Sequence, residues 1–187
     1  MFRLPSAILN TRLPALEVAA ENGPLSASDG ALPEDALRIF QREVSQNLME
    51  PEDSAKFGYA KLTITSASAS RVGRGLQTLQ MMTLMAPSLL GVPLEYYRSS
   101  VRAEVKVMNS QGEVLGSFTG AGTSNVRVAM YHGYSQMSAG RLADVEALRQ
   151  ALNQIRPQIE STSEAMRIKL LASGPIAPLP GVTASGR

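Results

Sequence analysis

The chain has 187 residues, a formal net charge of +2 and no cysteine. Its length predicts a single domain with tails, and a core of that size is stable without covalent cross-links. The lack of cysteine excludes disulfides, thiolate chemistry and cysteine-ligated metal sites. The basic residues are dispersed along the chain, whereas a nucleic-acid groove needs a contiguous basic face, so nucleic acid is not an expected partner.

The first half of the chain alternates between strand and helix patterns. Residues 13–18 form a short apolar run near Asn-Gly-Pro, which predicts an edge strand. A proline and two acidic residues at 33–35 predict the start of a helix of about four turns that ends before Pro51. Residues 59–65 alternate between apolar and polar side chains, as in a half-buried strand, and the Ser-Ala repeat at 66–70 is compatible with an extension of it.

The second half begins with another alternating strand. Residues 97–108 place valines and an alanine on one face and charged side chains on the other. The sequence Asn-Ser-Gln-Gly at 109–112 predicts a hairpin turn, with the partner strand at 114–118. We expect the glycines at 120–122 to break or bulge this strand, and residues 125–131 to be its continuation or a further strand.

A long amphipathic helix is expected near the C-terminus. Ser138 is its predicted N-cap, and Pro157 is expected to kink or end it. Apolar residues up to Leu171 are consistent with a further helical arm. The predicted apolar face consists of Leu142, Val145, Leu148, Leu152 and Ile155. The predicted polar faces carry Asp144, Glu146, Arg149 and Gln150.

This order of elements predicts the fold class α+β. We expect a two-layer domain, in which a mainly antiparallel sheet of about four to five strands carries two main helices on one face. The predicted organisation is an N-terminal extension at 1–12, a single α+β domain at 13–160, and a helical arm with a Pro/Gly-rich tail at 161–187.

No residue pattern predicts catalytic, metal-binding or cofactor-binding residues. His132 is the single histidine, so the sequence presents neither a metal-ligand cluster nor a Ser-His pair. The sequence from Gly120 to Ser124 resembles half of a phosphate loop, but it lacks the third glycine and the following Lys-Ser/Thr. Carboxylates are scattered over polar faces. We therefore expect no enzyme and no cofactor; the alternative is a small hydrolase that uses His132 with serine or aspartate partners.

The most unusual stretch runs from Gly75 to Leu94 without a charged residue. Its polar side chains and two prolines exclude a transmembrane helix. Three roles remain open for it: closing over the domain's own core, forming a surface for a partner or for self-association, or dipping into a membrane interface. The candidate partner-binding residues are Leu79, Met82, Met85, Leu89 and Leu90. The candidate contacts to lipid headgroups or other anions are Arg71, Arg74, Arg98 and Arg102.

Several of these patterns occur together in a known class of protein. They are Gly73-Arg-Gly75 after an apolar strand, Leu89-Leu-Gly-Val-Pro93, Asn109-Ser-Gln-Gly-Glu-Val114, Gly120-x-Gly122, Tyr131-His-Gly-Tyr134 and a final Ala/Leu-rich helix. On these motifs, across residues 13–160, the chain resembles small uncharacterised envelope lipoproteins of the Bacteroidetes type. More loosely, its element order is similar to the α+β domains of outer-membrane accessory lipoproteins of the curli-secretion and TolB N-terminal kind.

The resemblance implies a binding or assembly module rather than an enzyme. We expect a non-enzymatic accessory or assembly domain of the cell envelope that binds a protein partner or itself through residues 76–94. The alternative is a membrane-surface or lipid-binding module. Proteins of the resembling class are anchored through a lipidated cysteine. We therefore expect a periplasmic, outer-membrane-associated protein whose signal and lipidated cysteine are absent from this sequence; a cytoplasmic protein is the alternative.

Overall fold

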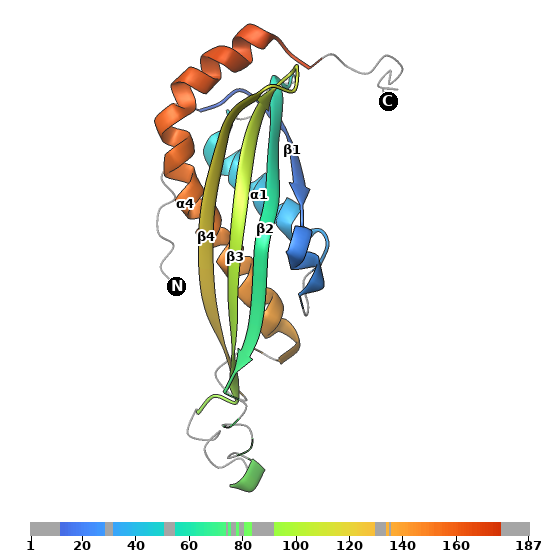
Figure 1. The fold of residues 1–187 in the computed structure, drawn as a ribbon, viewed down its shortest axis with the longest axis vertical. Coiled ribbons are helices and arrows are strands. Elements are labelled where there is room, and N and C mark those ends of the chain that lie inside the picture. The colour runs from blue at the N-terminus through green and yellow to red at the C-terminus, as the bar shows by residue number, and fades with distance from the viewer. Residues whose placement is uncertain are drawn as a thin grey trace.

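A four-stranded sheet forms one layer of the molecule, and two main helices form the other (Figure 1). The computed structural model describes residues 12–28, 32–50, 55–73, 75, 78, 81–83, 92–129, 134 and 136–176. The strands are β1 (Leu16–Glu21), β2 (Gly58–Val72), β3 (Glu95–Asn109) and β4 (Val114–Val128). The helices are α1 (Asp35–Glu43), α4 (Gln136–Ser173), a 3₁₀ turn η1 (Gly23–Ala27) and a π-helical turn η2 (Val44–Leu48) that continues α1.

The expected α+β fold class is confirmed. The spatial order is β1-β2-β3-β4, and both β2–β3 and β3–β4 are antiparallel. The sheet is mixed rather than purely antiparallel, because β1 pairs in parallel with β2. A parallel pair needs a crossover connection between its strands, and here that connection contains α1.

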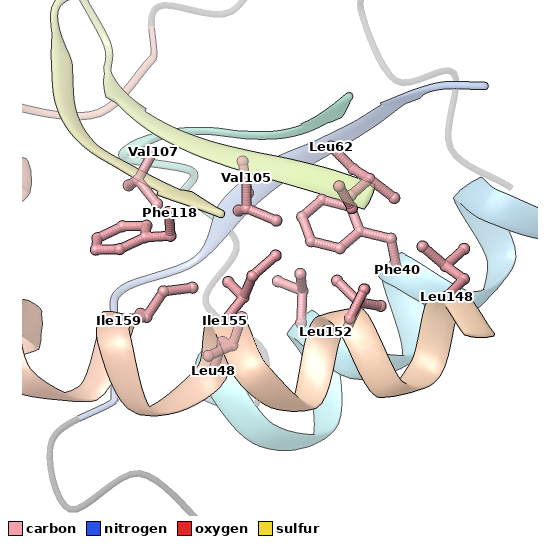
Figure 2. Close-up of a cluster of buried hydrophobic side chains, with 14 of the residues drawn as sticks. Phe40, Leu48, Leu62, Val105, Val107, Phe118, Leu148, Leu152, Ile155 and Ile159 are labelled. Carbon is pink, nitrogen blue, oxygen red and sulfur yellow. The ribbon is translucent and has the colours of Figure 1, made fainter. Parts of the chain in front are cut away.

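Strand faces follow the alternation in the sequence. On β3, Val101, Ala103, Val105 and Val107 are all buried, as expected. Figure 2 shows part of the core: Phe40 of α1 and Leu152 and Ile155 of α4 lie against sheet residues that include Leu62 and Val105. The opposite face of the sheet has no helix over it in the described part of the chain, and the polar residues of the alternation lie there.

The long helix begins earlier than predicted and continues past Pro157 as the expected helical arm. α4 begins at Gln136, two residues before the predicted N-cap, and it runs through Pro157 for 38 residues in all. Figure 1 shows that α4 changes direction along its course but does not stop. An interior proline costs a helix about 3 kcal/mol. Burial on both sides of the proline offsets that cost, because Ile155 and Ile159 belong to the same core as Met166 and Leu170.

The glycines at 120 and 122 do not break β4, so that expectation is wrong. Both pair in regular register with β3, and the register shift lies instead opposite Val107 and Met108. Their role is close approach: a Cβ at Gly120 would overlap the carbonyl oxygen of Ala151, and a Cβ at Gly122 would overlap that of Ala147. The helix backbone therefore lies directly against the strand.

The buried face of α4 is consequently built from alanine as well as leucine and isoleucine. Its buried alanines are Ala139, Ala143, Ala147 and Ala151. Of the predicted apolar face, Leu148, Leu152 and Ile155 are buried, whereas Leu142 and Val145 are only half-buried. The face that contacts the sheet is thus rotated towards the small residues, since only these permit the approach to the glycines of β4.

We predict that Gly122→Ala lowers the free energy of unfolding by about 2 kcal/mol, because the methyl group must displace the backbone of α4. Denaturation with urea measures the change. Gly75→Ala is the matched control, because no atom lies within 4 Å of a Cβ built there. Equal free energies of unfolding for the two variants would show that α4 leaves room for a methyl group at position 122.

Candidate functional site

The features with functional potential lie at one end of the sheet, which we call the distal end. It consists of residues 66–72 of β2, 95–102 of β3 and 121–128 of β4, which pair side by side. The opposite end is closed by the predicted hairpin turn, where Gly112 adopts a φ of +83° and donates its N–H to Asn109 O at 3.0 Å. Figure 1 shows the two ends at the top and bottom of the long strands.

A described piece of the uncharged segment, residues 81–83, lies beyond the distal end. Met81 and Met82 are 72% and 80% exposed, and Figure 1 shows the short green helical piece that contains them beyond the strand ends. Met82 is therefore accessible, as a partner-binding residue must be. The other four candidate residues of this set, Leu79, Met85, Leu89 and Leu90, lie outside the described residues.

The candidate arginines separate onto two faces of the sheet. Arg71 faces the helix layer, where its guanidinium carbon lies 5.0 Å from the centre of the Tyr97 ring. Arg98 and Arg102 are exposed on the open face. Arg74 lies outside the described residues. The three described arginines therefore cannot contact one flat surface together.

A groove of about 270 Å³ lies on the helix side of the distal end. It separates η1 and the distal half of β2 from the first turns of α4, since neither α1 nor α4 covers this part of the strand. Its lining residues are Pro24, Ala27, Ser28, Ala67, Ser68, Ala69, Ser70, Arg71, Tyr97, Gly140 and Asp144. Small and apolar side chains predominate, so the groove suits an apolar occupant better than a charged one.

Asp144 is a buried carboxylate at this groove, and its expected place on a polar face is wrong. It is only 3% exposed. Ser99 donates a hydrogen bond to its Oδ1 at 2.6 Å, and Ser28 donates one to its Oδ2. Hydrogen bonds of this kind offset the cost of burying a charge. Asp144 thus connects α4, β3 and the segment after η1, which is a structural role.

The outer edge of β4 is covered by a row of glutamines from α4. The N–H of Thr123 donates to Gln150 Oε1 at 3.3 Å, and the N–H of Ala121 donates to Gln154 Oε1 at 3.1 Å. One turn further on, Gln158 Nε2 donates to Thr119 O at 2.8 Å. These glutamines, spaced four residues apart, satisfy edge groups that would otherwise be a template for another strand.

The outer edge of β2 is covered only along part of its length. β1 pairs with residues 58–63 and then ends. η1 follows, and Gly23 approaches Ile64 so closely that a Cβ there would overlap the carbonyl oxygen of Ile64. Beyond this point, no residue in the described part of the chain forms a hydrogen bond to the backbone of Ala67 or Ala69 on this side.

A second and larger groove, of about 1140 Å³, lies between α1 and α4. Two ion pairs connect its walls: Arg141 donates to both oxygens of Asp35 at 2.6 and 2.7 Å, and Arg156 Nε donates to Glu43 Oε1 at 2.7 Å. The hydrogen bonds from Arg141 lower the pKa of Asp35 below its ordinary value. A carboxylate held in its charged form by an arginine is a poor general base. The ion pairs in this groove therefore have a structural role: they hold α1 against α4.

The described residues present no catalytic arrangement. They contain no group of three or more His, Asp or Glu residues placed to hold a metal ion. Gly120 and Gly122 lie under α4 within a strand, which leaves no room for a phosphate group. His132 lies outside the described residues, and the expectation of a non-enzymatic protein stays a prediction. Among the described helices, none has a stretch apolar enough to span a bilayer.

The chain is similar to solved bacterial lipoproteins at low sequence identity. No family model matches the chain, and no curated protein matches its sequence. A solved minor lipoprotein from Acinetobacter baumannii is similar at 10% identity and a TM-score of 0.37, over 86% of this chain and 96% of that one. The rare lipoprotein B from Shewanella oneidensis is similar at 11% identity and a TM-score of 0.29, over 84% of this chain and 97% of that one. Scores this low carry no argument about shared function.

We predict that replacing both Gln150 and Gln154 with alanine accelerates hydrogen exchange of the Ala121 and Thr123 amides about fivefold, because each loses a hydrogen bond of about 1 kcal/mol. Exchange measured by NMR gives the rates. Gln154→Glu retains an acceptor oxygen and is expected to preserve the protection of Ala121. Unchanged rates in the double alanine variant would mean that the glutamines do not cover this edge.

Proposed function

We propose that this chain is a non-enzymatic accessory or assembly domain of the cell envelope that binds a protein partner through the distal end of its sheet. The observation that carries the proposal is that contact features accumulate there. The exposed Met81 and Met82, the groove and the part of the β2 edge that no described residue covers all lie at this end. Exposed methionines suit contacts that must adapt to a partner's shape.

The rest of the molecule supports this division of roles. Among the described residues, the main buried cluster draws on β1–β4, η1, α1, η2, α4 and Leu13, and it includes neither Met81 nor Met82. A second cluster of Tyr97, Val128, Ala139 and Ala143 packs the helix side of the distal end. A domain whose core is complete can expose apolar side chains for a partner without losing its fold. The proposed envelope location is supported by the sequence motifs across residues 13–160, which resemble those of envelope lipoproteins.

The proposal is tested by photo-cross-linking in cells of the source organism. A photoreactive amino acid at position 82 is expected to give a discrete adduct with a protein of the envelope fraction. The same amino acid at Val114, which is 51% exposed beside the hairpin turn at the opposite end, is the matched control and is expected to give none.

Two results would contradict the proposal. One is the absence of any adduct from position 82, and the other is recovery of the chain outside the envelope fraction. The variant Met82→Asp separates a contact role from a folding role: we expect it to keep its melting temperature and to lose its partner. Loss of the fold would assign the segment to the core.

A membrane surface is the second candidate partner, and the open face of the distal end favours it. Arg98 and Arg102 lie on that face, and their cross-strand partners are uncharged: Ser70 and Asn125 for Arg98, and Ser66 and Ala121 for Arg102. The open face of the distal end carries no carboxylate among its described residues. An arginine near an anionic membrane surface contributes about 1 kcal/mol of binding free energy.

Co-sedimentation with phosphatidylglycerol vesicles tests this second candidate. We predict that Arg98→Gln with Arg102→Gln weakens binding at least about tenfold at low salt, as two lost contacts of about 1 kcal/mol each imply. Arg38→Gln with Arg149→Gln removes the same charge from the helix layer and is expected to have little effect, since these arginines are exposed on the other side of the molecule. Equal losses in both pairs, or no binding of the unmodified protein, would rule out a specific membrane-facing surface.

A further inference from the structure

We propose that the distal half of the β2 edge accepts an extended segment of a partner protein as an additional strand of the sheet. This inference rests on the proposed function, because it assumes that the domain binds a protein. It adds the place of contact, the backbone geometry of the contact and the side-chain pattern of the partner.

The two edges of the sheet differ in how far the described residues cover their backbone groups. On β4, glutamines at 150, 154 and 158 occupy successive outward-facing backbone groups. On β2, β1 occupies residues 58–63 and Gly23 closes on Ile64. The backbone from Ser66 onwards has no such cover from the described residues, although it pairs with β3 on its other side as far as Val72. An uncovered edge with regular strand geometry is the structure that pairs with an added strand.

The direction of the backbone groups follows from the covered edge. Successive residues of a strand point their N–H and C=O groups to opposite sides of that strand. On β4 the groups that face the outer edge belong to Thr119, Ala121 and Thr123, whose side chains point away from the helices. β2 runs in the same direction as β4, but its free edge is on the other side, so its edge-facing groups belong to residues whose side chains face the helices. In the uncovered part, these include Ala67 and Ala69.

The groove beside this edge selects which side chains of a partner segment can fit. Residues opposite one another in a sheet share a face, so partner residues opposite Ala67 and Ala69 would point towards the helix layer and into the groove of about 270 Å³. The groove offers them Tyr97 and small apolar side chains. The intervening partner residues would lie on the open face beside Ser66, Ser68 and Ser70. The partner segment therefore alternates apolar and polar residues.

A second copy of this chain is the competing occupant. The sequence Ser66-Ala-Ser-Ala-Ser70 reads the same in both directions, so two copies could pair in an antiparallel manner about Ser68. That arrangement would place only the methyl groups of Ala67 and Ala69 over the groove. The volume available there favours larger side chains, and thus a segment from another protein.

The test uses a synthetic nonapeptide of alternating threonine and valine with a lysine at each end. Backbone hydrogen bonds supply affinity in strand addition, so a generic extended peptide is a suitable probe. We expect the peptide to slow hydrogen exchange of the Ala67 and Ala69 amides at least about tenfold and to leave that of Ala121 unchanged. A peptide with N-methylated valines, which lacks the corresponding donors, is expected to give no protection.

Matched proline substitutions test the same contact from the protein side. Ala69→Pro removes an edge-facing N–H while leaving the hydrogen bonds to β3 in place, a position at which strands tolerate proline. It is expected to weaken binding of the peptide at least tenfold, as measured by NMR titration. Ala121→Pro removes an N–H from the covered edge of β4 and is expected to leave binding unchanged. Should Ala69→Pro fail to fold, the methylated peptide still decides the question on the unmodified protein.

Three outcomes would overturn the inference. The first is no protection of Ala67 and Ala69 by the peptide, and the second is equal protection by the methylated peptide. The third is protection that rises with protein concentration alone, together with a dimer in sedimentation, which would assign the edge to a second copy. If strand addition fails while the cross-link from position 82 persists, the proposed function stands and only the place of contact is wrong.

Discussion

The close approach of α4 to β4 is the contact on which the rest of the structure depends. Gly120 and Gly122 have no side chain to keep the helix away, so the backbone of α4 at Ala147 and Ala151 lies directly against the strand. Because the helix lies so near the strand, the glutamine side chains at 150 and 154 reach its outer backbone groups. The packing of α4 on β4 and the covering of the β4 edge by glutamines therefore depend on the same close approach.

The same position of α4, against β4, leaves the distal half of β2 without a helix from the described residues over it. With α4 held against β4, the described residues that pack on β2 lie towards its start: Leu170 of α4 at Gly58, Phe40 of α1 at Leu62 (Figure 2) and η1 at Ile64. The distal half of β2 extends past that cover, and a groove results between η1, β2 and the first turns of α4. Asp144 of α4 stabilises the walls of this groove, because it accepts hydrogen bonds from Ser99 of β3 and from Ser28, which follows η1. The distal end is thus partly packed and partly accessible: Tyr97, Val128, Ala139 and Ala143 form a second buried cluster there, whereas the groove and the exposed Met81 and Met82 remain available for contact.

Local patterns predicted most of the strands and their faces. The alternation in β2 and β3 and the hairpin turn at 109–112 are confirmed. The first helix reaches its predicted end before Pro51 only through the π-helical turn η2, which continues α1. The errors fall where a residue's role depends on a distant segment. The glycines of β4 permit contact with α4 instead of forming a bulge, and Asp144 is buried because Ser28 and Ser99 converge on it. At Pro157 the sequence left a kink or an end open, and contacts on both sides of the proline decide for a continuous helix. Of the candidate binding residues, Met82, Arg98 and Arg102 are exposed, Arg71 lies over Tyr97 on the helix side, and the others lie outside the described residues.

The sequence by itself determined the α+β class and which side chains of each strand face inward, because the period of a strand is a property of neighbouring residues. It also marked residues 75–94 as the unusual part of the chain. Only the tertiary structure decided that α4 covers the β4 edge and that none of the described residues covers the distal β2 edge. Edge coverage depends on where a helix more than twenty residues away comes to rest against the sheet, and that position is set by contacts between backbones, which leave no periodic pattern in the sequence.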